Sequence, residues 1–232
     1  MYLFAGGGHS PSLYRSLLQK IFSGLPRPAD TVAYIGAANG DNHSFFTGMA
    51  ALLRAAGAGT VRHARVSGAA EREKAQSIIA AAPVIFIGGG DVEKGMERLT
   101  EAKLCDLLRQ RAKDGALLCG FSAGSIMLCR EWITWTDPDD DRSAARFPCL
   151  NIAPMCCDTH GEDDDWSELR ALIALSPAET LGYGIPSGSA VSANPAGTLI
   201  AYGAPVACFR RTQTGVVNES PLMPRNTQTE KA

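Results

Sequence analysis

A serine between two glycines is the residue of this sequence best suited to nucleophilic chemistry. Ser122 lies in the stretch Gly-Phe-Ser-Ala-Gly at 120–124, between the apolar runs 116–119 and 126–129. A strand, a sharp turn carrying serine and a helix form the G-x-S-x-G nucleophile elbow, in which a strained backbone pushes the hydroxyl outward. The glycines keep side chains out of the tight turn. The motif therefore predicts that Ser122 attacks a carbonyl carbon, with an ordinary strand-to-helix turn as the alternative.

A serine hydroxyl needs a base within hydrogen-bond reach, most often a histidine that a carboxylate orients. The sequence has four histidines. His9 and His43 stand at expected helix starts and His63 in an expected strand, where capping, surface or packing roles are the simpler interpretation. His160 follows a mixed segment downstream of the serine, in the loop 156–161, where such a histidine can be brought over the hydroxyl. Spacing alone leaves both interpretations of His160 open.

Acidic residues are abundant after the serine motif, and most of them are expected on a solvated face. They are Asp137, Asp139, Asp140, Asp141, Asp158, Glu162, Asp163, Asp164, Asp165 and Glu168. The run 162–165 precedes an expected helix, where carboxylates favour the positive end of the dipole. Acids beside a catalytic histidine could also select a cationic substrate. Consecutive acids point in different directions and no second histidine stands at ligand spacing, so no metal site is predicted.

Acyl transfer also needs hydrogen-bond donors for the oxyanion. The backbone N–H of Ala123 directly follows the serine, and the turn Gly-Gly-Gly-Asp at 88–91 ends a neighbouring expected strand. We expect Gly89 or Gly90 to supply the second donor, with Asp91 in the same binding turn. A phosphate-binding loop is the alternative, but neither G-x-x-x-x-G-K-[ST] nor G-x-G-x-x-G with its later acid is present. No cofactor is predicted.

The elements that must position these residues alternate between strands and helices. The first expected strands lie at 2–5, 31–35, 61–66, 84–87 and 116–119. The expected helices between and after them lie at 10–22, 44–56, 69–81, 92–99 and 101–113. This alternation predicts a mostly parallel sheet covered by helices on both faces. Residues 138–147 are expected as a charged loop, 149–155 as a mixed segment and 166–175 as a helix.

The last part of the chain is expected to add short strands. They lie at 181–185, 190–193, 199–202 and 206–210. Their length and spacing predict an antiparallel end to the sheet. At 232 residues the chain suits one α/β domain and is short for two. We expect a single domain over 1–212 and a weakly ordered tail over 213–232.

Composition favours small partners. The net charge is −2 and the basic residues are scattered, which gives no electrostatic footprint for nucleic acid or an anionic membrane. The seven cysteines form no C-x-x-C pair and lie mostly in apolar segments, so reduced, buried thiols are expected. With neither a signal-peptide pattern nor a long apolar stretch, a cytoplasmic location is predicted.

Two motifs together resemble a known family. Ile-Gly-Gly-Gly-Asp at 87–91 and Gly-Phe-Ser-Ala-Gly-Ser at 120–125 resemble peptidase family S51, the serine peptidases that include dipeptidase E and cyanophycinase. The resemblance spans most of the chain and includes the glycines at 6–8, the loop at 35–38 and the segment at 183–185. It implies a three-layer fold similar to class I glutamine amidotransferases, with serine in place of their cysteine.

The resemblance also implies roles for individual residues. Ser122 matches the family's nucleophile, His160 its histidine and Asp137 its acid. Relatives that remove amino-terminal aspartate have, after the histidine, a longer loop with an arginine suited to a substrate carboxylate. Here that loop is shorter and acidic, and Asp163 and Asp164 are expected to contribute to substrate binding. An acidic lining would repel an aspartyl substrate.

A second departure concerns the catalytic acid. Cyanophycinase-like members carry an acidic residue in a Gly-Ile-Asp-Glu-type segment, where this chain has Gly-Ile-Pro-Ser at 184–187. The missing acid places more weight on Asp137.

Residues and resemblance together predict a serine peptidase that hydrolyses small peptides and is not strictly aspartyl-specific. An esterase or acyltransferase using the same serine, and a catalytically silent binding protein on this scaffold, are the alternatives. No nucleic-acid or membrane partner is expected, and a homodimer is left open.

Overall fold

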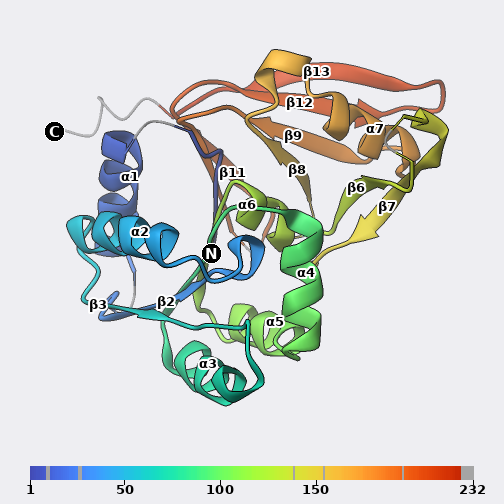
Figure 1. Cartoon of the computed structure of the whole chain (residues 1–232). Helices are drawn as coiled ribbons and strands as arrows, with labels where there is room; N and C mark the ends of the chain where they lie inside the picture. Colours follow the sequence, from blue (N-terminus) through green and yellow to red (C-terminus); the bar gives the residue numbers. More distant parts are fainter. Residues whose placement is uncertain (9–10, 26–27, 138, 154, 195, 226–232) are drawn as a thin grey trace, which may run out of the picture.

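The structure is a computed structural model that describes residues 1–8, 11–25, 28–137, 139–153, 155–194 and 196–225 (Figure 1). The strands of its main sheet are β1 Tyr2–Ala5, β2 Thr31–Ile35, β3 Thr60–His63, β4 Val84–Ile87, β5 Leu117–Phe121, β10 Ala190–Ala193 and β11 Leu199–Tyr202. Their order is β11-β10-β1-β5-β4-β2-β3. The strands β1 to β5 pair in parallel, and β10 and β11 add antiparallel pairs at one edge. The predicted mostly parallel sheet is confirmed.

Helices cover both faces of the main sheet and complete three layers. They are α1 Pro11–Ser23, α2 His43–Ala55, α3 Ala69–Ala81, α4 Val92–Glu101, α5 Cys105–Lys113 and α6 Ala123–Leu128. Successive side chains of a strand point to opposite faces. Leu3 and Val32 therefore pack in one core with α1 and α2. Phe4 and Ile85 pack in the other core with the helices α3 to α6.

A smaller second sheet and a hairpin stand beside the main sheet. Their strands are β6 Glu131–Trp135, β7 Ala144–Pro148, β8 Cys156–Thr159, β9 Leu181–Ile185, β12 Val206–Arg211 and β13 Val216–Leu222. The second sheet has the order β13-β12-β9-β8, and β6 pairs with β7. The helix α7 (Ser167–Leu175) contacts both the second sheet and the hairpin. Figure 1 shows these elements gathered on one side of the main sheet.

The carboxyl half of the chain departs from the sequence-based expectations. The expected antiparallel end of one sheet is divided, because β10 and β11 extend the main sheet whereas β9, β12 and β13 belong to the second sheet. The expected charged loop at 138–147 contains most of β7, and part of the expected loop at 156–161 is the buried strand β8. β8 ends in aspartate and threonine, and β7 contains an arginine and ends in proline, so neither has the apolar pattern typical of a strand.

The expected weakly ordered tail is partly a strand. β13 occupies Val216–Leu222 and pairs antiparallel with β12 at the edge of the second sheet. Pro221 is tolerated there because an edge strand has one side free of ladder hydrogen bonds. Residues 226–232 lie outside the described residues, as does Ser10, the first residue of the expected helix 10–22.

Candidate active site

Ser122 stands on a turn between the end of β5 and the start of α6. Its backbone has φ 53° and ψ −123°, a strained conformation for a residue with a side chain. Hydrogen bonds hold it there: the Ser122 N–H donates to the Ala5 carbonyl at 2.9 Å, and the Ser125 N–H donates to the Ser122 carbonyl at 2.7 Å. The strand, turn and helix thus present the Ser122 side chain at the carboxyl end of the parallel strands.

The two glycines of the motif are required by close packing. A Cβ on Gly120 would lie 2.4 Å from the Ser125 backbone nitrogen, and a Cβ on Gly124 would lie 2.1 Å from the Ile87 carbonyl oxygen. Real Cβ atoms do not approach other atoms so closely. Glycine at these two positions allows α6 to turn back onto β5 and onto the end of β4.

His160 comes to Ser122 from the second sheet. Its Nε2 lies 2.8 Å from Ser122 Oγ, a hydrogen-bond distance. His160 directly follows β8 and has φ 50°, and its backbone N–H donates to the Ile185 carbonyl of β9 at 3.1 Å. The parallel pairing of β8 with β9 therefore fixes the start of the loop that carries the imidazole. The structure brings together the serine and the histidine that the sequence singled out.

Gly7, after β1, is a third close neighbour of this pair. A Cβ on Gly7 would lie 3.2 Å from Ser122 Cβ and 3.3 Å from His160 Cδ2. Its φ of +83° also favours glycine. The sequence marked this position only as part of a glycine turn, without a connection to the catalytic pair.

Asp137 is not brought to His160. It lies exposed in the loop of the β6–β7 hairpin, where its backbone N–H donates to Ser143 Oγ at 3.0 Å. Its Oδ1 accepts the Asp139 N–H at 3.1 Å. These are contacts within the hairpin, and the described contacts of Asp137 include none with the histidine. The position that the resemblance assigned to the acid is thus occupied here by a loop-stabilising residue.

Other carboxylates lie closer to His160. Glu162 is in a short 3-10 helix at Glu162–Asp164, and its Oε1 accepts the Ser187 N–H at 3.0 Å. Partial burial works against ionisation of Glu162, but the hydrogen bonds from Ser187 and the nearby His160 hold its pKa below the ordinary value. Partial burial and the charge of Asp164 raise the pKa of Glu168, an effect that His160 opposes.

A cavity of about 430 Å³ opens beside Ser122 and His160 and is strongly acidic. The carboxylates that line it are Asp91, Glu93, Asp158, Asp164 and Glu168. Within the described part of the chain, its lining includes no lysine or arginine. Of the two acids expected to bind substrate after the histidine, Asp164 lines the cavity, whereas Asp163 is exposed outside it.

Asp158 is the most buried of these acids. Burial, with repulsion from Glu168, Asp164 and Glu162, raises its pKa to about 7, although the Thr159 N–H opposes the shift. The sequence placed Asp158 among ten acids without distinguishing it. Asp158 differs from the other acids because it lies at the end of a buried strand, and the sequence did not predict that strand.

The glycine turn after β4 lies against the nucleophile. A Cβ on Gly89 would stand 3.2 Å from Ser122 Cβ, and Gly90 and Ala123 line the cavity. Asn39 Nδ2 donates to the Gly89 carbonyl at 2.9 Å. Because a trans peptide points its N–H opposite to its carbonyl, this bond turns the Gly90 N–H away from Asn39.

Asp91 has a structural task in the same turn. Its Oδ1 accepts the Lys94 N–H at 3.0 Å as the N-cap of α4, and its Oδ2 lies 3.0 Å from Lys94 Nζ. Hydrogen bonds from Lys94 lower its pKa, although partial burial opposes them. This carboxylate is thus already partnered at the rim of the cavity, unlike Asp158.

The remaining histidines are away from this cavity or outside the described residues. His63 Nε2 lies 3.3 Å from Asp41 Oδ1, and its ring stacks on Phe46 at 4.4 Å between centroids. The predicted packing role of His63 is confirmed. His43 begins α2 and His9 is not among the described residues.

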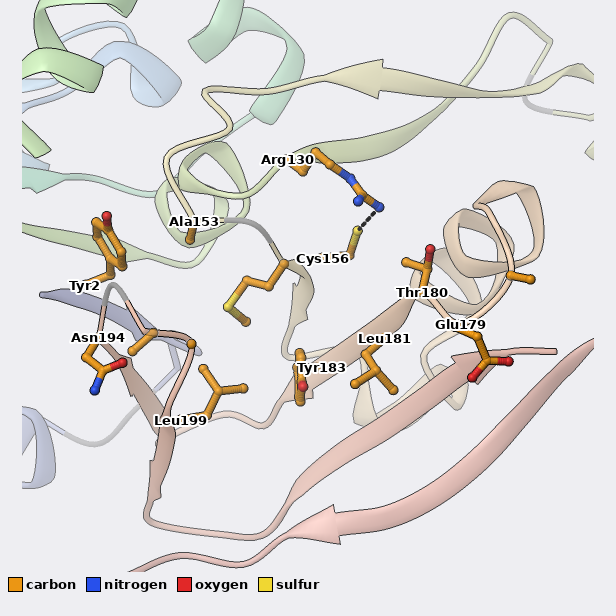
Figure 2. Close-up of a pocket in the computed structure, with 14 residues that line it drawn as sticks. Tyr2, Arg130, Ala153, Cys156, Glu179, Thr180, Leu181, Tyr183, Asn194 and Leu199 are labelled. Carbon is orange, nitrogen blue, oxygen red and sulfur yellow. Dashed lines mark hydrogen bonds between the residues drawn. The ribbon is translucent and has the colours of Figure 1, made fainter. Parts of the chain in front are cut away.

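A second cavity of about 370 Å³ opens where β8 and β9 begin (Figure 2). It therefore lies at the other end of these strands from His160, which follows the end of β8. Figure 2 shows Tyr183, Leu181 and Leu199 on its walls and Arg130 above it. Arg130 Nη2 donates hydrogen bonds to Glu131 Oε1 at 3.0 Å and to Cys156 Sγ at 3.7 Å. The described lining contains no serine or histidine, so this cavity offers no second hydrolytic pair.

Two searches of the described residues bear on other functions. No group of three or more His, Cys, Asp or Glu side chains among them is arranged to hold a metal ion. Their helices include none long and apolar enough to cross a membrane.

Comparisons with known proteins identify the family and the fold of the chain. Residues 1–199 match the sequence model of peptidase family S51. The fold is similar to a peptidase from an acI-B1 Actinobacterium, with a TM-score of 0.71 and 16% identity over 97% of this chain and 94% of that one. It is also similar to a candidate peptidase E from Listeria monocytogenes EGD-e, with a TM-score of 0.59 and 13% identity over 94% and 96% of the two chains. A search of curated proteins found no match.

Proposed function

Since the chain belongs to peptidase family S51, we propose that this serine peptidase hydrolyses small peptides through an acyl-enzyme formed on Ser122. The observation that carries the proposal is the 2.8 Å distance between Ser122 Oγ and His160 Nε2. A hydroxyl in this position can transfer its proton to the imidazole as it attacks a carbonyl carbon. The cavity beside the pair has room for a substrate of the size of a dipeptide.

The reaction would proceed in two halves. Ser122 Oγ attacks the peptide carbonyl while His160 Nε2 takes the hydroxyl proton, and the carbonyl oxygen becomes an oxyanion. The N–H groups of Ala123 and Gly90 are our candidates for its donors. His160 then gives the proton to the leaving amine, and the C–N bond breaks. In the second half His160 takes a proton from water, whose oxygen attacks the ester carbonyl. The bond between the carbonyl carbon and Ser122 Oγ then breaks, and His160 returns the proton to Ser122 Oγ.

We assign the task of orienting His160 to Glu162 rather than to Asp137. The charge of His160 favours the ionised form of Glu162, whereas the contacts of Asp137 are within its own hairpin. Glu162 Oε1 also accepts the N–H of Ser187, which stands in the segment where cyanophycinase-like members have an acid. A carboxylate from a neighbouring loop thus reaches the region of the missing one.

The assignment of Ser122 can be tested with a fluorophosphonate, which labels an activated serine. We expect the wild type to be labelled and to cleave dipeptides, and Ser122→Ala to do neither while keeping its thermal unfolding midpoint. Ser77→Ala, on the exposed side of α3, is the control for an unrelated serine. Full activity of Ser122→Ala would reject the mechanism.

The same preparation separates the alternative reactions. Comparing matched ester and amide substrates distinguishes a peptidase from an esterase or acyltransferase. Labelling no greater than in a denatured control, together with no hydrolysis, would favour a silent binding protein.

Three matched substitutions test which carboxylate orients His160. We expect Glu162→Gln to lower kcat on the order of a hundredfold, because the imidazolium loses its stabilising carboxylate. Asp137→Asn is expected to change kcat less than about threefold, and Asp163→Asn, at an exposed acid outside the cavity, is the matched control. A large loss confined to Asp137→Asn would return the role to that residue.

The expected cytoplasmic location and the homodimer left open remain predictions. Cell fractionation tests the first, and light scattering on the purified chain tests the second.

A further inference from the structure

Asp158 is buried at the end of β8 without a cationic partner. Asp158 is only 6% exposed, yet it lines the cavity beside Ser122. Its Oδ1 accepts the neighbouring Thr159 N–H at 2.6 Å. Within the described residues its Oδ2 accepts no hydrogen bond and meets no lysine or arginine. A buried carboxylate in this state is costly unless something compensates it.

The carboxylates around Asp158 add to this cost rather than relieve it. Glu168 of α7, and Asp164 and Glu162 of the 3-10 helix, repel its charge. Asp91 at the N-cap of α4, Glu93 in the first turn of α4 and His160 line the same cavity. Lys94 pairs with Asp91 at the rim. The cavity therefore concentrates negative charge beside the reacting serine.

The dipole of α7 explains part of the acidic cluster but not all of it. Asp164 accepts the Trp166 N–H at 3.0 Å and the Ser167 hydroxyl at 2.9 Å at the start of that helix, and Glu168 lies in its first turn. Such positions favour carboxylates without any ligand. Asp158 belongs to β8 and has no share in this effect, so its burial requires a separate explanation.

We propose that Asp158, Asp164 and Glu168 form a subsite for a positively charged nitrogen group of the substrate. The inference rests on the proposed function, because the subsite lies in the same cavity as Ser122 and would therefore hold a residue next to the scissile bond. A protonated amine or a guanidinium supplies both the charge and the hydrogen-bond donors that Asp158 Oδ2 lacks. The acids accordingly select cationic peptides and repel aspartyl ones.

Two parts of a peptide could supply this group: the free α-ammonium, or the side chain of lysine or arginine. Four dipeptides distinguish them, namely Lys-Ala and norleucyl-Ala, each with a free or an acetylated amino terminus. Norleucine has the length of lysine without its charge. Binding to Ser122→Ala is measured by calorimetry at pH 8, so that the result does not depend on turnover.

We expect Lys-Ala to bind at least about tenfold more tightly than acetyl-norleucyl-Ala, as charge-assisted hydrogen bonds would give. Tight binding of acetyl-Lys-Ala identifies the side chain as the cation, and tight binding of free norleucyl-Ala identifies the α-ammonium. Either result supports the subsite. Equal binding of all four dipeptides, or binding of none, overturns it.

Matched substitutions in the Ser122→Ala background test which acid produces the preference for the cationic peptide. Asp158→Asn is expected to reduce the preference for the cationic peptide to less than about threefold. Asp163→Asn, an exposed acid of the same loop outside the cavity, is expected to leave it unchanged. An unchanged preference in Asp158→Asn overturns the assignment. Circular dichroism checks that the variant folds, and Glu168→Gln provides a second, more exposed site for the same test.

A pH series on the unsubstituted subsite gives a readout that needs no change at Asp158. Burial raises the pKa of this carboxyl to about 7, so where the lysine side chain is the cation we expect the preference for acetyl-Lys-Ala over acetyl-norleucyl-Ala to increase from pH 6 to pH 8 as Asp158 loses its proton. The lysine side chain keeps its charge over this range, whereas an α-ammonium with a pKa of about 8 does not. A preference for acetyl-Lys-Ala that stays constant over this range contradicts the involvement of Asp158. Loss of serine labelling in the wild type, with cation binding intact, would instead reject the peptidase mechanism alone.

Discussion

The buried carboxyl of Asp158 has a measurable consequence for stability. Its pKa is about 7 in the folded chain, whereas the ordinary pKa of an aspartate is 3.8, so between these two pH values the folded state holds a proton that the unfolded state has lost. The free energy of unfolding therefore falls as pH rises from about 4 to about 7, and the loss is complete above the folded pKa. Three pH units correspond to about 4 kcal/mol, which is an upper limit.

Asp158→Asn should remove this loss. We expect urea unfolding to show the variant more stable than the wild type at pH 8, by up to a few kcal/mol, with the difference disappearing toward pH 4. Asp163→Asn is the control because that side chain is exposed. A variant less stable than the wild type at pH 8 would mean that the ionised carboxylate has a partner in the folded state.

Single residues differ in how far the sequence could assign them. Ser122 was singled out by the glycine motif around it, and His160 because it is one of only four histidines and follows the serine in the chain. The acids Asp137 and Asp158 were not distinguishable by type, since the segment 137–168 contains ten acids. Only the folded chain separates an exposed hairpin residue from a carboxyl buried beside the histidine. Burial in the folded chain, rather than residue type, distinguishes Asp158 from Asp137.

At the scale of elements, the site depends on how three of them meet. The loop after β1 places Gly7 against both the serine after β5 and the histidine after β8. Gly7→Ala would insert a methyl group 3.2 Å from Ser122 Cβ and 3.3 Å from His160 Cδ2. Since small misplacements of reacting groups are costly, we expect kcat/KM to fall at least about tenfold.

Gly197→Ala is a matched control for this substitution. Gly197 has φ +84°, close to the +83° of Gly7, but a Cβ there would meet nothing within 4 Å. Both variants should lose roughly 1–2 kcal/mol of stability from the left-handed backbone, as chemical unfolding can measure. Only Gly7→Ala should lose activity. Equal kcat/KM in the two variants would show that the loop after β1 does not constrain the catalytic pair.

The elements of the amino-terminal half were the more predictable ones. Strands such as β4 (Val84–Ile87) are continuous apolar runs, and their spacing from helices follows the α/β pattern. β8 (Cys156–Thr159) is as buried, yet it ends in aspartate and threonine and pairs with a strand more than twenty residues later. Its identity comes from that long-range pairing. Sequence spacing therefore left the role of His160 open, and the family resemblance assigned it.

At the scale of the whole molecule, the two cores determine which thiols can react. Each of the seven cysteines is free, and only Cys105 is more than slightly exposed. Burial raises the pKa of the Cys119 and Cys156 thiols to about 12, and it raises the pKa of Cys129 well above its usual value. The Sγ atoms of Cys129 and Cys157 lie 3.3 Å apart as a hydrogen-bonded pair. The expected buried, free thiols are therefore found in both cores of the fold.

The native chain should consequently behave as a protein with one reactive thiol. We expect brief treatment with N-ethylmaleimide at pH 7 to add one label, at Cys105, because thiolates react and buried thiols neither ionise nor meet the reagent. After unfolding in urea all seven cysteines should be labelled, which mass spectrometry can count. Rapid labelling of Cys129 or Cys157 in the native chain would show that the packing between α6 and β8, which joins the serine to the histidine, opens readily. Since catalysis needs that packing closed, the rate of labelling at these two thiols measures how firmly the whole fold holds its site.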